Sequence, residues 1–401
     1  MTAAQPAPPD HRAATVDFER VTKVYGPGSA SSPGAVNDLS LHVPAGKICV
    51  LVGPSGCGKT TSLKLVNRLI EPTGGRILID GVDIATSDPT KLRRRIGYVI
   101  QSTGLFPHQT VGVNVAVVPS LLGWSSARQR ERADELLALV GLDPVRYRDR
   151  YPSQLSGGER QRVGVARALA ADPPLMLMDE PFGAVDPIVR DRLQNEFLRL
   201  QDELAKTILF VTHDIDEAIK LGDLVAIMAT GGRLAQFAPP AEILANPASA
   251  FVARFVGADR GLKRLSLVRV RDLPLDDAVT ARPGDAVAEH RTRAQEASSG
   301  YLLLVDDDRR PIGWVDLRDG DPRGDGDARL TTEMAHPMSP LLEPETTAKD
   351  ALSKLLDADV QMGIVVDRNG RVDGLITLET IAGLARSGPD PGSGPDGGPG
   401  R

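Results

Sequence analysis

One stretch near the N-terminal end of the chain has the residue types and spacing of a phosphate-binding loop. The segment GPSGCGKTT, residues 53–61, fits the pattern G-x-x-x-x-G-K-[S/T] and precedes the helix-forming sequence TSLKLVNRLI. In such a loop, backbone N–H groups and a helix N-terminus face phosphate oxygens, a lysine reaches the β and γ phosphates, and a hydroxyl binds Mg²⁺. A glycine-rich turn with an incidental lysine is the alternative. The candidate residues are Gly53, Pro54, Ser55, Gly56, Cys57, Gly58, Lys59, Thr60 and Thr61.

Two carboxylates and a histidine follow other apolar runs. Asp179 and Glu180 come directly after Leu175–Met178, and His213 ends the run TILFVTH. Ligands of parallel sheets bind at the carboxyl ends of the strands, so these side chains are expected beside the phosphate loop. Asp179 is expected to hold Mg²⁺ through its water shell, Glu180 to act as general base on the attacking water, and His213 to sense and orient a γ-phosphate. A strand end that simply meets solvent is the structural alternative.

The segment LSGGERQR, residues 155–162, predicts the start of a helix with an unusual first turn. Ser156 as N-cap and Glu159 three residues later form a capping box, which by itself is a purely structural feature. The capping box does not explain Gly157 and Gly158, since each glycine costs roughly 1 kcal/mol of helix propensity. A close approach of another group to this backbone, such as a phosphate bound by another subunit, would explain them.

The elements that must position these residues follow from the apolar pattern. The runs at 47–53, 175–180 and 207–213 are apolar at consecutive rather than alternate positions, which is typical of strands buried on both faces. Between Val16 and about Gly257 such runs alternate with amphipathic stretches, so we expect an α/β unit with a largely parallel sheet.

Length and composition limit the number of domains and the classes of function. The chain of 401 residues is long enough for two or three domains, and its net charge of -6 argues against a nucleic-acid binder with a basic surface. Its two cysteines, Cys49 and Cys57, make neither a disulfide framework nor a metal site. No apolar stretch approaches a membrane span, and no signal peptide is recognisable. Residues 1–14 and 387–401 are rich in Pro, Gly, Ala or Ser and are predicted to be disordered.

The C-terminal part contains a weak internal repeat. Val305–Leu317 aligns with Val366–Leu378, 61 residues later, with five identities in thirteen positions. Each copy reads as a strand, an acidic turn and a second strand after a helix-like segment, at 285–297 and 348–358, which indicates a duplicated βαβ-type module. Two unrelated hairpins with similar turns are the alternative.

The order of the motifs GPSGCGKTT, Gln101, LSGGERQR, LMLMDEP, Asp186 and His213 resembles the nucleotide-binding subunits of ABC transporters over about residues 15–257. The resemblance implies that Tyr25 stacks on adenine, that Gln101 links Mg²⁺ to the membrane partner, and that Asp186 belongs to a loop that crosses the dimer. Val185 replaces the family's usual leucine before this acid. It also implies a head-to-tail homodimer with two ATP molecules between phosphate loops and signature segments.

The site implied by this resemblance has three groups of residues. The catalytic residues are Lys59, Gln101, Glu180 and His213. The Mg²⁺ ligands are Thr60, Gln101 and Asp179. Besides the phosphate loop, the nucleotide-binding residues are Tyr25, Gln101, Ser156, Gly157, Gly158, Glu159, Asp186 and His213.

The sequence from Ile96 to Pro119 is similar to importer ATPases for glycine betaine, choline, carnitine and related quaternary amines, and the C-terminal repeat is similar to their tandem CBS pair. The expected order is a nucleotide-binding domain with a helical subdomain (15–258), a linker (259–271) and an α+β tandem CBS module (272–386). The resemblance implies permease subunits, an indirect binding-protein partner, a place at the cytoplasmic face of the membrane, and regulation by an ionic or small-molecule ligand. A dimer-stabilising CBS module without a ligand stays open.

Two other classes of function are alternatives. A soluble ABC ATPase of translation or DNA repair commonly has two fused ATPase units or a coiled-coil insertion, and neither is visible in this sequence. A nucleotide-sensing module, in which the CBS pair binds the ligand and turnover is incidental, is the other. Steady ATPase activity that responds to ionic strength favours a transporter motor over a sensor.

Overall fold

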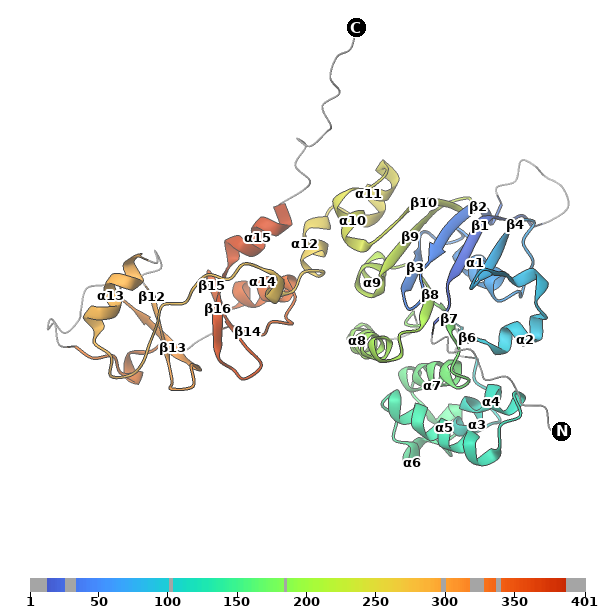
Figure 1. The fold of residues 1–401 in the computed structure, drawn as a ribbon, viewed down its shortest axis with the longest axis horizontal. Helices are drawn as coiled ribbons and strands as arrows, with labels where there is room; N and C mark the ends of the chain where they lie inside the picture. The colour runs from blue at the N-terminus through green and yellow to red at the C-terminus, as the bar shows by residue number, and fades with distance from the viewer. Residues whose placement is uncertain are drawn as a thin grey trace, which may run out of the picture. The chain divides into compact units, whose positions relative to one another are not determined.

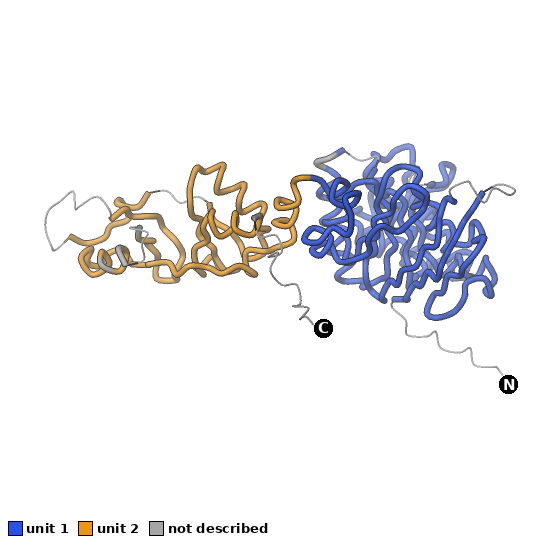
Figure 2. The backbone as a smooth tube through the Cα atoms, turned by 90° about the horizontal axis from the view of Figure 1, so that it is seen from above, with its two compact units in different colours: residues 1–257 blue, residues 258–401 orange. Residues whose placement is uncertain are grey.

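The chain divides into two compact units, Met1–Gly257 (unit 1) and Ala258–Arg401 (unit 2), which Figure 2 distinguishes by colour. The structure is a computed structural model that describes residues 13–25, 34–100, 104–183, 186–296, 301–317, 328–336 and 340–386. The predictions for Gln101, for Val185 and, apart from residues 13 and 14, for disorder at 1–14 and 387–401 lie outside these residues. The predicted disorder is wrong at Ala14, which is buried and whose N–H donates to the carbonyl of Pro174 at 3.2 Å. Among the helices described, none has both the length and the apolar character that crossing a bilayer requires.

Unit 1 is built on a six-stranded sheet with the strand order β10-β9-β3-β8-β7-β6. Neighbours from β9 to β6 pair in parallel, and β10 is an antiparallel edge strand. Every residue of β3, β7 and β8 is buried, as their apolar runs predict. The strands are β3 (Ile48–Val52), β6 (Ile96–Val99), β7 (Leu175–Asp179), β8 (Thr207–Thr212), β9 (Leu224–Ala229) and β10 (Arg233–Ala238).

A second sheet in unit 1 is antiparallel, with the order β2-β1-β4-β5. The predicted parallel sheet therefore accounts for only part of this unit. Burial alternates along β2, so its face toward the core is marked by every second residue. One continuous apolar core joins the two sheets and the first helix. The strands are β1 (Val16–Lys23), β2 (Val36–Val43), β4 (Gly74–Ile79) and β5 (Val82–Asp83).

Helices α3 to α7 gather into a helical subdomain at the end of unit 1 that carries β6 and β7 (Figure 1). Helices α1 and α9 pack directly on the parallel sheet. The helices of this unit are α1 (Lys59–Val66), α2 (Pro89–Arg94), α3 (Val111–Val115), α4 (Val117–Leu121), α5 (Ser126–Leu139), α6 (Pro144–Tyr147), α7 (Gly157–Leu169), α8 (Pro187–Leu204), α9 (Ile215–Leu221), α10 (Pro240–Ala245) and α11 (Ala250–Val256), with 3-10 turns η1 (Ile84–Thr86) and η2 (Pro152–Gln154).

Unit 2 contains two sheets of the same topology, β11-β12-β13 and β14-β15-β16. In each sheet the first strand pairs in parallel and the hairpin is antiparallel. The elements are β11 (Thr280–Ala281), α13 (Val287–Glu296), β12 (Tyr301–Val305), β13 (Pro311–Asp316), η4 (Thr332–Met334), β14 (Leu341–Leu342), α14 (Ala348–Asp357), β15 (Met362–Val366), β16 (Val372–Thr377) and α15 (Leu378–Arg386).

The acidic turns of the two copies have the same hydrogen bonds, which confirms the predicted repeat. The Oδ1 atom of Asp306 accepts from the N–H groups two and four residues later at 3.0 and 2.7 Å. Asp367, at the equivalent position, accepts from the same two positions at 2.8 and 2.9 Å. Arg309 has φ 64° where the second copy has Gly370 at φ 78°, so one turn geometry serves both.

The interval 259–271, expected to be a linker, is instead folded into unit 2. It contains α12 (Arg260–Leu265) and η3 (Val270–Asp272). The side chains of Leu265 and Val270 are fully buried in a core shared with α14 and α15. Leu265 is the last residue of α12 and Val270 is the first residue of η3, and the second copy of the repeat covers both side chains.

Candidate nucleotide site

The phosphate loop connects the end of β3 to the first residue of α1. Gly58 is the N-cap of this helix, with φ 99°, and a Cβ added to it would lie 1.9 Å from the carbonyl oxygen of Ala35. Only glycine fits this close approach. The buried Lys59 ammonium donates to the carbonyl oxygens of Gly53 at 2.7 Å and Pro54 at 3.1 Å. The carbonyl groups of the loop therefore already surround the Lys59 ammonium, which the sequence predicts to bind phosphate.

The loop is connected to the carboxylate strand by a side-chain hydrogen bond. The Thr60 hydroxyl donates to Oδ1 of Asp179 at 3.0 Å. Burial raises the pKa of the Asp179 carboxyl, and the Thr60 bond opposes this shift. The hydroxyl and the carboxylate predicted as metal ligands thus lie side by side. Both supply oxygen, the donor atom that Mg²⁺ prefers.

Glu180 and His213 meet at the carboxyl ends of neighbouring strands β7 and β8. Nδ1 of His213 lies 3.2 Å from Oε1 of Glu180. Glu180 has φ 46°, unusual for a residue other than glycine, and its N–H donates to the carbonyl of Val211 at 2.9 Å. The strand pairing therefore brings together the predicted general base and the predicted phosphate sensor.

The loop that carries His213 is fixed on both sides. The Thr212 hydroxyl accepts from Asp214 N–H at 3.0 Å, and Asp214 caps α9 by accepting from Asp216 N–H at 2.8 Å. The buried Glu217, on α9, accepts a 3.0 Å hydrogen bond from the buried side chain of Gln194. Burial raises the pKa of Glu217. These supporting residues were not predicted, since nothing in their local sequence marks them.

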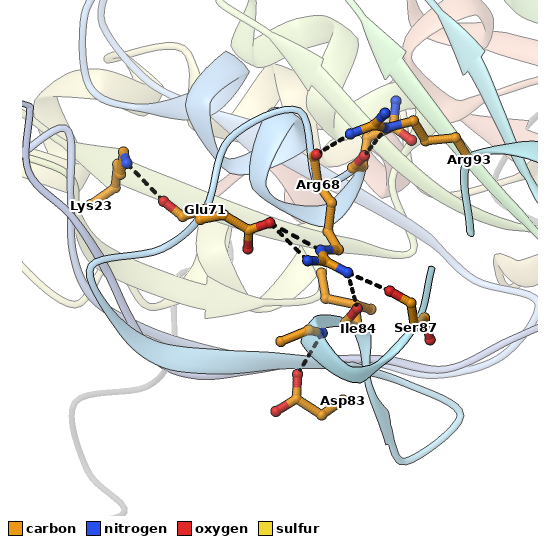
Figure 3. Close-up of polar contacts among 9 residues, drawn as sticks. Lys23, Arg68, Glu71, Asp83, Ile84, Ser87 and Arg93 are labelled. Carbon is orange, nitrogen blue, oxygen red and sulfur yellow. Dashed lines mark hydrogen bonds and ion pairs between the residues drawn. The ribbon is translucent and has the colours of Figure 1, made fainter. Parts of the chain in front are cut away.

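The far end of α1 is anchored by the network in Figure 3. Arg68 donates to the Glu71 carboxylate at 2.9 and 3.1 Å and to the carbonyl oxygens of Ile84 and Ser87 at 3.0 and 2.5 Å. Lys23, at the end of β1, donates to the carbonyl of Glu71 at 2.7 Å. The helix behind the phosphate loop is therefore tied to the antiparallel sheet.

The predicted capping box at the start of α7 is present. The Ser156 hydroxyl accepts from Glu159 N–H at 3.3 Å, and the Glu159 carboxylate accepts from Ser156 N–H at 2.7 Å. The Tyr147 hydroxyl donates to the other oxygen of Glu159 at 2.7 Å. We call residues 156–159 the signature turn. Tyr147 was not predicted, because it lies twelve positions before Glu159, on the far side of η2.

Nothing in the described part of the chain explains why the signature turn contains Gly157. A Cβ added there would have no described heavy atom within 4 Å, and one added to Gly158 would make only ordinary contacts. Ser156 and Gly157 are both exposed. The backbone of Gly157 is therefore open to contact with a second molecule.

Two other predicted residues lie on the surface. The Tyr25 side chain is 58% exposed, with the Lys23 ammonium 5.3 Å from its ring centroid. Asp186 is exposed just before α8, and its carbonyl accepts from Arg190 N–H at 2.8 Å. The described contact of the Tyr25 ring is with Lys23 and not with Lys59 or Asp179.

A groove of about 410 Å³ opens in the helical subdomain among α3, α4, α5 and the segment after α6, and we call it the α3 groove. Apolar side chains on its wall are unusually open to solvent, with Val113 50% and Leu121 57% exposed. The charged residues of the lining are Arg130, Arg148 and Asp149, and Arg148 forms ion pairs with Asp134 at 2.6 Å and with Asp149 at 3.7 Å.

The fold and this site agree with comparisons to known proteins. A family model for the ABC transporter matches residues 36–183, and a CBS domain model matches residues 334–386. The ATP-binding cassette MJ0796, solved as a dimer in a post-hydrolysis state bound to ADP and Pi, is 33% identical with a TM-score of 0.51, over 56% of this chain and 98% of that chain. Unit 1 is an ATPase of the ABC class.

Longer relatives define the family more closely. The osmoprotectant import ATP-binding protein OsmV of Salmonella typhimurium is 44% identical over 93% of this chain and 97% of its own length. The choline transport ATP-binding protein OpuBA of Bacillus subtilis is 45% identical over 92% of this chain and 95% of its own length. The chain belongs to the family of ATP-binding subunits of ABC importers for osmoprotectants, with a C-terminal CBS module.

Proposed function

We propose that this chain hydrolyses ATP to energise the uptake of a quaternary amine, such as glycine betaine, choline, carnitine or proline betaine, across the cell membrane. The proposal is supported by relatives named for osmoprotectant, choline and carnitine transport that align along nearly the whole chain. The observation that carries the motor role is the hydrogen bond between Thr60 and Asp179, which joins the phosphate loop to the carboxylate strand. The solute is selected by partner subunits.

In this proposal the phosphate loop, residues 53–61, binds the triphosphate of ATP. Lys59 exchanges its carbonyl partners for β- and γ-phosphate oxygens, and the N–H groups at the start of α1 add donors. Thr60 and Asp179 would hold Mg²⁺, with Gln101 as a third ligand. When bound, Mg²⁺ neutralises phosphate charge. Tyr25 stacks on the adenine ring.

Hydrolysis is assigned to the pair at the ends of β7 and β8. Glu180 accepts a proton from the attacking water as general base. His213 lies 3.2 Å from the Glu180 carboxylate, where it orients this group and senses the γ-phosphate.

A second copy of the chain completes each site. The exposed signature turn has no internal reason for Gly157, so its free N–H groups and the dipole of α7 are available to a γ-phosphate bound by the partner. Asp186 contributes from the loop before α8. ATP binding closes this head-to-tail homodimer, and hydrolysis opens it.

The α3 groove is the proposed docking surface for a permease subunit at the cytoplasmic face of the membrane. Its exposed apolar wall, with Val113 and Leu121, suits one apolar helix of the partner. A substrate-binding protein is a further, indirect partner. Unit 2 is proposed to regulate turnover through an ionic or small-molecule ligand, with dimer stabilisation as the second candidate.

Replacement of Glu180 by Gln tests the motor assignment. The amide keeps the shape of the side chain but cannot accept a proton, so we expect turnover to fall by roughly 100-fold or more. ATP binding should be unchanged, and radiolabelled ATP should stay with the protein after rapid desalting. Glu242→Gln, which changes an exposed glutamate on α10, is the matched control. Wild-type turnover in Glu180→Gln would remove Glu180 from its role.

Uptake assays test the solute class. The chain would be co-purified with candidate permeases, reconstituted into vesicles and supplied with labelled betaine, choline, carnitine and proline. ATP-dependent uptake of at least one quaternary amine is expected. Uptake of none of them, by a complex that hydrolyses ATP, would contradict the proposal.

A further inference from the structure

Both oxygens of the Glu159 carboxylate are engaged within the chain. Oε2 accepts from Ser156 N–H at 2.7 Å, and Oε1 accepts from the Tyr147 hydroxyl at 2.7 Å. Hydrogen bonds to an ionised group are shorter and roughly twice as strong as neutral ones. Glu159 therefore fixes the backbone of the signature turn, while Tyr147 fixes Glu159.

Electrostatics also argue against Glu159 as a direct ligand of ATP. The signature turn is proposed to meet a γ-phosphate, and a carboxylate in contact with that group would repel it. The same carboxylate, held back against Ser156 and Tyr147, leaves the N–H groups of the turn as the nearest partners of a phosphate. Its role is then to shape the turn.

Tyr147 comes from a separate element that is itself held in place. It is the last residue of α6. The guanidinium carbons of Arg150 and Arg146 lie 4.9 and 5.4 Å from the centroid of its ring, within the range of cation–π attraction. The position of the Tyr147 hydroxyl therefore depends on the backbone that follows α6.

That backbone is bonded to the wall of the α3 groove. The carbonyl of Arg148 accepts from Gly112 N–H at 2.8 Å, and the carbonyl of Arg150 accepts from Val111 N–H at 2.8 Å. Gly112 and Arg148 both line the groove. A Cβ added to Gly112 would lie 2.5 Å from Cγ of Arg148, so the two segments are in close contact. A shift of α3 must therefore move the residues next to Tyr147.

We propose that Tyr147 is a positioning residue that, through its hydrogen bond to Glu159, sets the geometry of the signature turn and connects that turn to the α3 groove. The inference rests on the proposed function, because it assumes that the turn closes over ATP held by a second copy. It adds a physical route by which a permease segment in the groove controls closure. The route consists of the bonds from α3 to residues 148 and 150, then Tyr147, Glu159 and Ser156.

The first test is Tyr147→Phe in the full-length chain, which removes one hydroxyl and little else. Tyr151→Phe is the matched control, since Tyr151 lies four residues away with its side chain 45% exposed. In the otherwise wild-type chain, kcat should fall roughly tenfold for Tyr147→Phe, as expected for the loss of a hydrogen bond to a charged group. KM for ATP and the affinity for a fluorescent ATP analogue should stay within about twofold, because the phosphate loop is untouched. Tyr151→Phe should match the wild type.

In the Glu180→Gln background the same change should speed the release of trapped radiolabelled ATP by roughly tenfold. If the Glu180→Gln parent traps no ATP, the proposed composite site is wrong, and the kcat measurement still tests Tyr147. If the parent traps ATP and Tyr147→Phe releases it at the parent's rate, only the positioning role is wrong.

A double-mutant cycle tests whether the two residues act as one unit. Glu159→Ala removes the carboxylate that accepts from both Ser156 and Tyr147, so in this background the Tyr147 hydroxyl has no hydrogen bond to Glu159 left to lose. The double variant Tyr147→Phe, Glu159→Ala should therefore be no slower than Glu159→Ala alone. Additive losses in kcat would overturn the proposal.

The link to the groove is tested in the assembled transporter in nanodiscs. Solute-stimulated ATPase activity should fall more than basal activity in Tyr147→Phe, and Tyr151→Phe should leave the ratio of the two unchanged. An unchanged ratio in Tyr147→Phe would show that the signature turn does not respond to the groove through this bond.

Discussion

At the scale of single residues, Lys59 shows how the site is held ready. Its ammonium is buried and donates to two carbonyl oxygens of its own loop, so the cation already has partners before any anion arrives. A buried charge without partners would cost several kcal/mol. The carbonyls keep the charge in the loop that we propose binds phosphate, and phosphate oxygens, which share the negative charge of the triphosphate, are stronger acceptors than carbonyl oxygens.

The Glu159 carboxyl predicts a pH dependence at this scale. The hydrogen bond from Tyr147, followed by that from Ser156, lowers the pKa of Glu159 from 4.5 to about 2. Because the pKa is lower in the folded chain, this stabilisation is complete above about pH 4.5 and is lost as the pH falls toward 2. Arg162, on α7, adds a smaller effect of the same sign.

Thermal unfolding of the wild type and of Tyr147→Phe should show this dependence. We expect the difference in Tm between them to be constant from pH 7 to about pH 5 and to shrink below about pH 4.5, where the Glu159 carboxylate becomes protonated in the variant first. Tyr151→Phe serves as the control at each pH. A difference that grows on acidification would contradict the assigned cause.

At the scale of elements, the strands that are buried on both faces could be predicted from the sequence. The three strands at 48–52, 175–179 and 207–212 are buried on both faces, and their consecutive apolar residues marked them to within two residues. The pairing of β8 between β3 and β7 could not be predicted, since order in a sheet leaves no local signal. The antiparallel sheet was missed although β2 alternates clearly.

Some residues of the candidate site could be predicted from the sequence and others could not. Lys59, Thr60, Asp179, Glu180 and His213 follow motifs, and strand pairing alone brings them together. Residues that act on the site through other side chains, such as Tyr147 and Gln194, come from distant segments that only the folded chain juxtaposes. Their roles were therefore not predictable from sequence.

The junction between loop and helix predicts different effects at two glycines. Gly56 and Gly58 both have positive φ, 77° and 99°, but only Gly58 faces a neighbouring backbone. Gly56→Ala should cost about 1 kcal/mol for its left-handed conformation. Gly58→Ala must also displace Ala35, so its loss of stability should be at least about twice as large. Scanning calorimetry of the full chain measures both, and equal losses would contradict the close approach of the Ala35 carbonyl to Gly58.

At the scale of the whole molecule, the chain separates a motor unit from a duplicated module. The two copies in unit 2 share an apolar core formed by both hairpins, with Leu303 and Val305 from one and Ile364 and Val366 from the other. Each copy therefore depends on the other for burial. The segment 265–273 adds to the second copy, so unit 2 begins directly after Gly257.

Removal of residues 258–401 tests whether unit 1 hydrolyses ATP without unit 2 and whether unit 2 regulates transport. Because the phosphate loop, the carboxylates and the signature turn all lie in unit 1, we expect basal ATPase activity within about twofold of the full chain. The response of the assembled transporter to ionic strength should be lost. An unchanged salt profile of uptake in vesicles would leave unit 2 only a structural role.

In the proposed dimer, each ATP is enclosed by Lys59 of one copy and the signature turn of the other. Two variants in the Glu180→Gln background test it when co-expressed with different tags: Lys59→Ala in one chain and Ser156→Arg in the other. Neither variant alone should retain ATP after desalting. The mixed complex should retain about one ATP per two chains, because it contains one intact composite site. If the mixed complex retains no more ATP than either variant alone, the two residues do not act across the dimer.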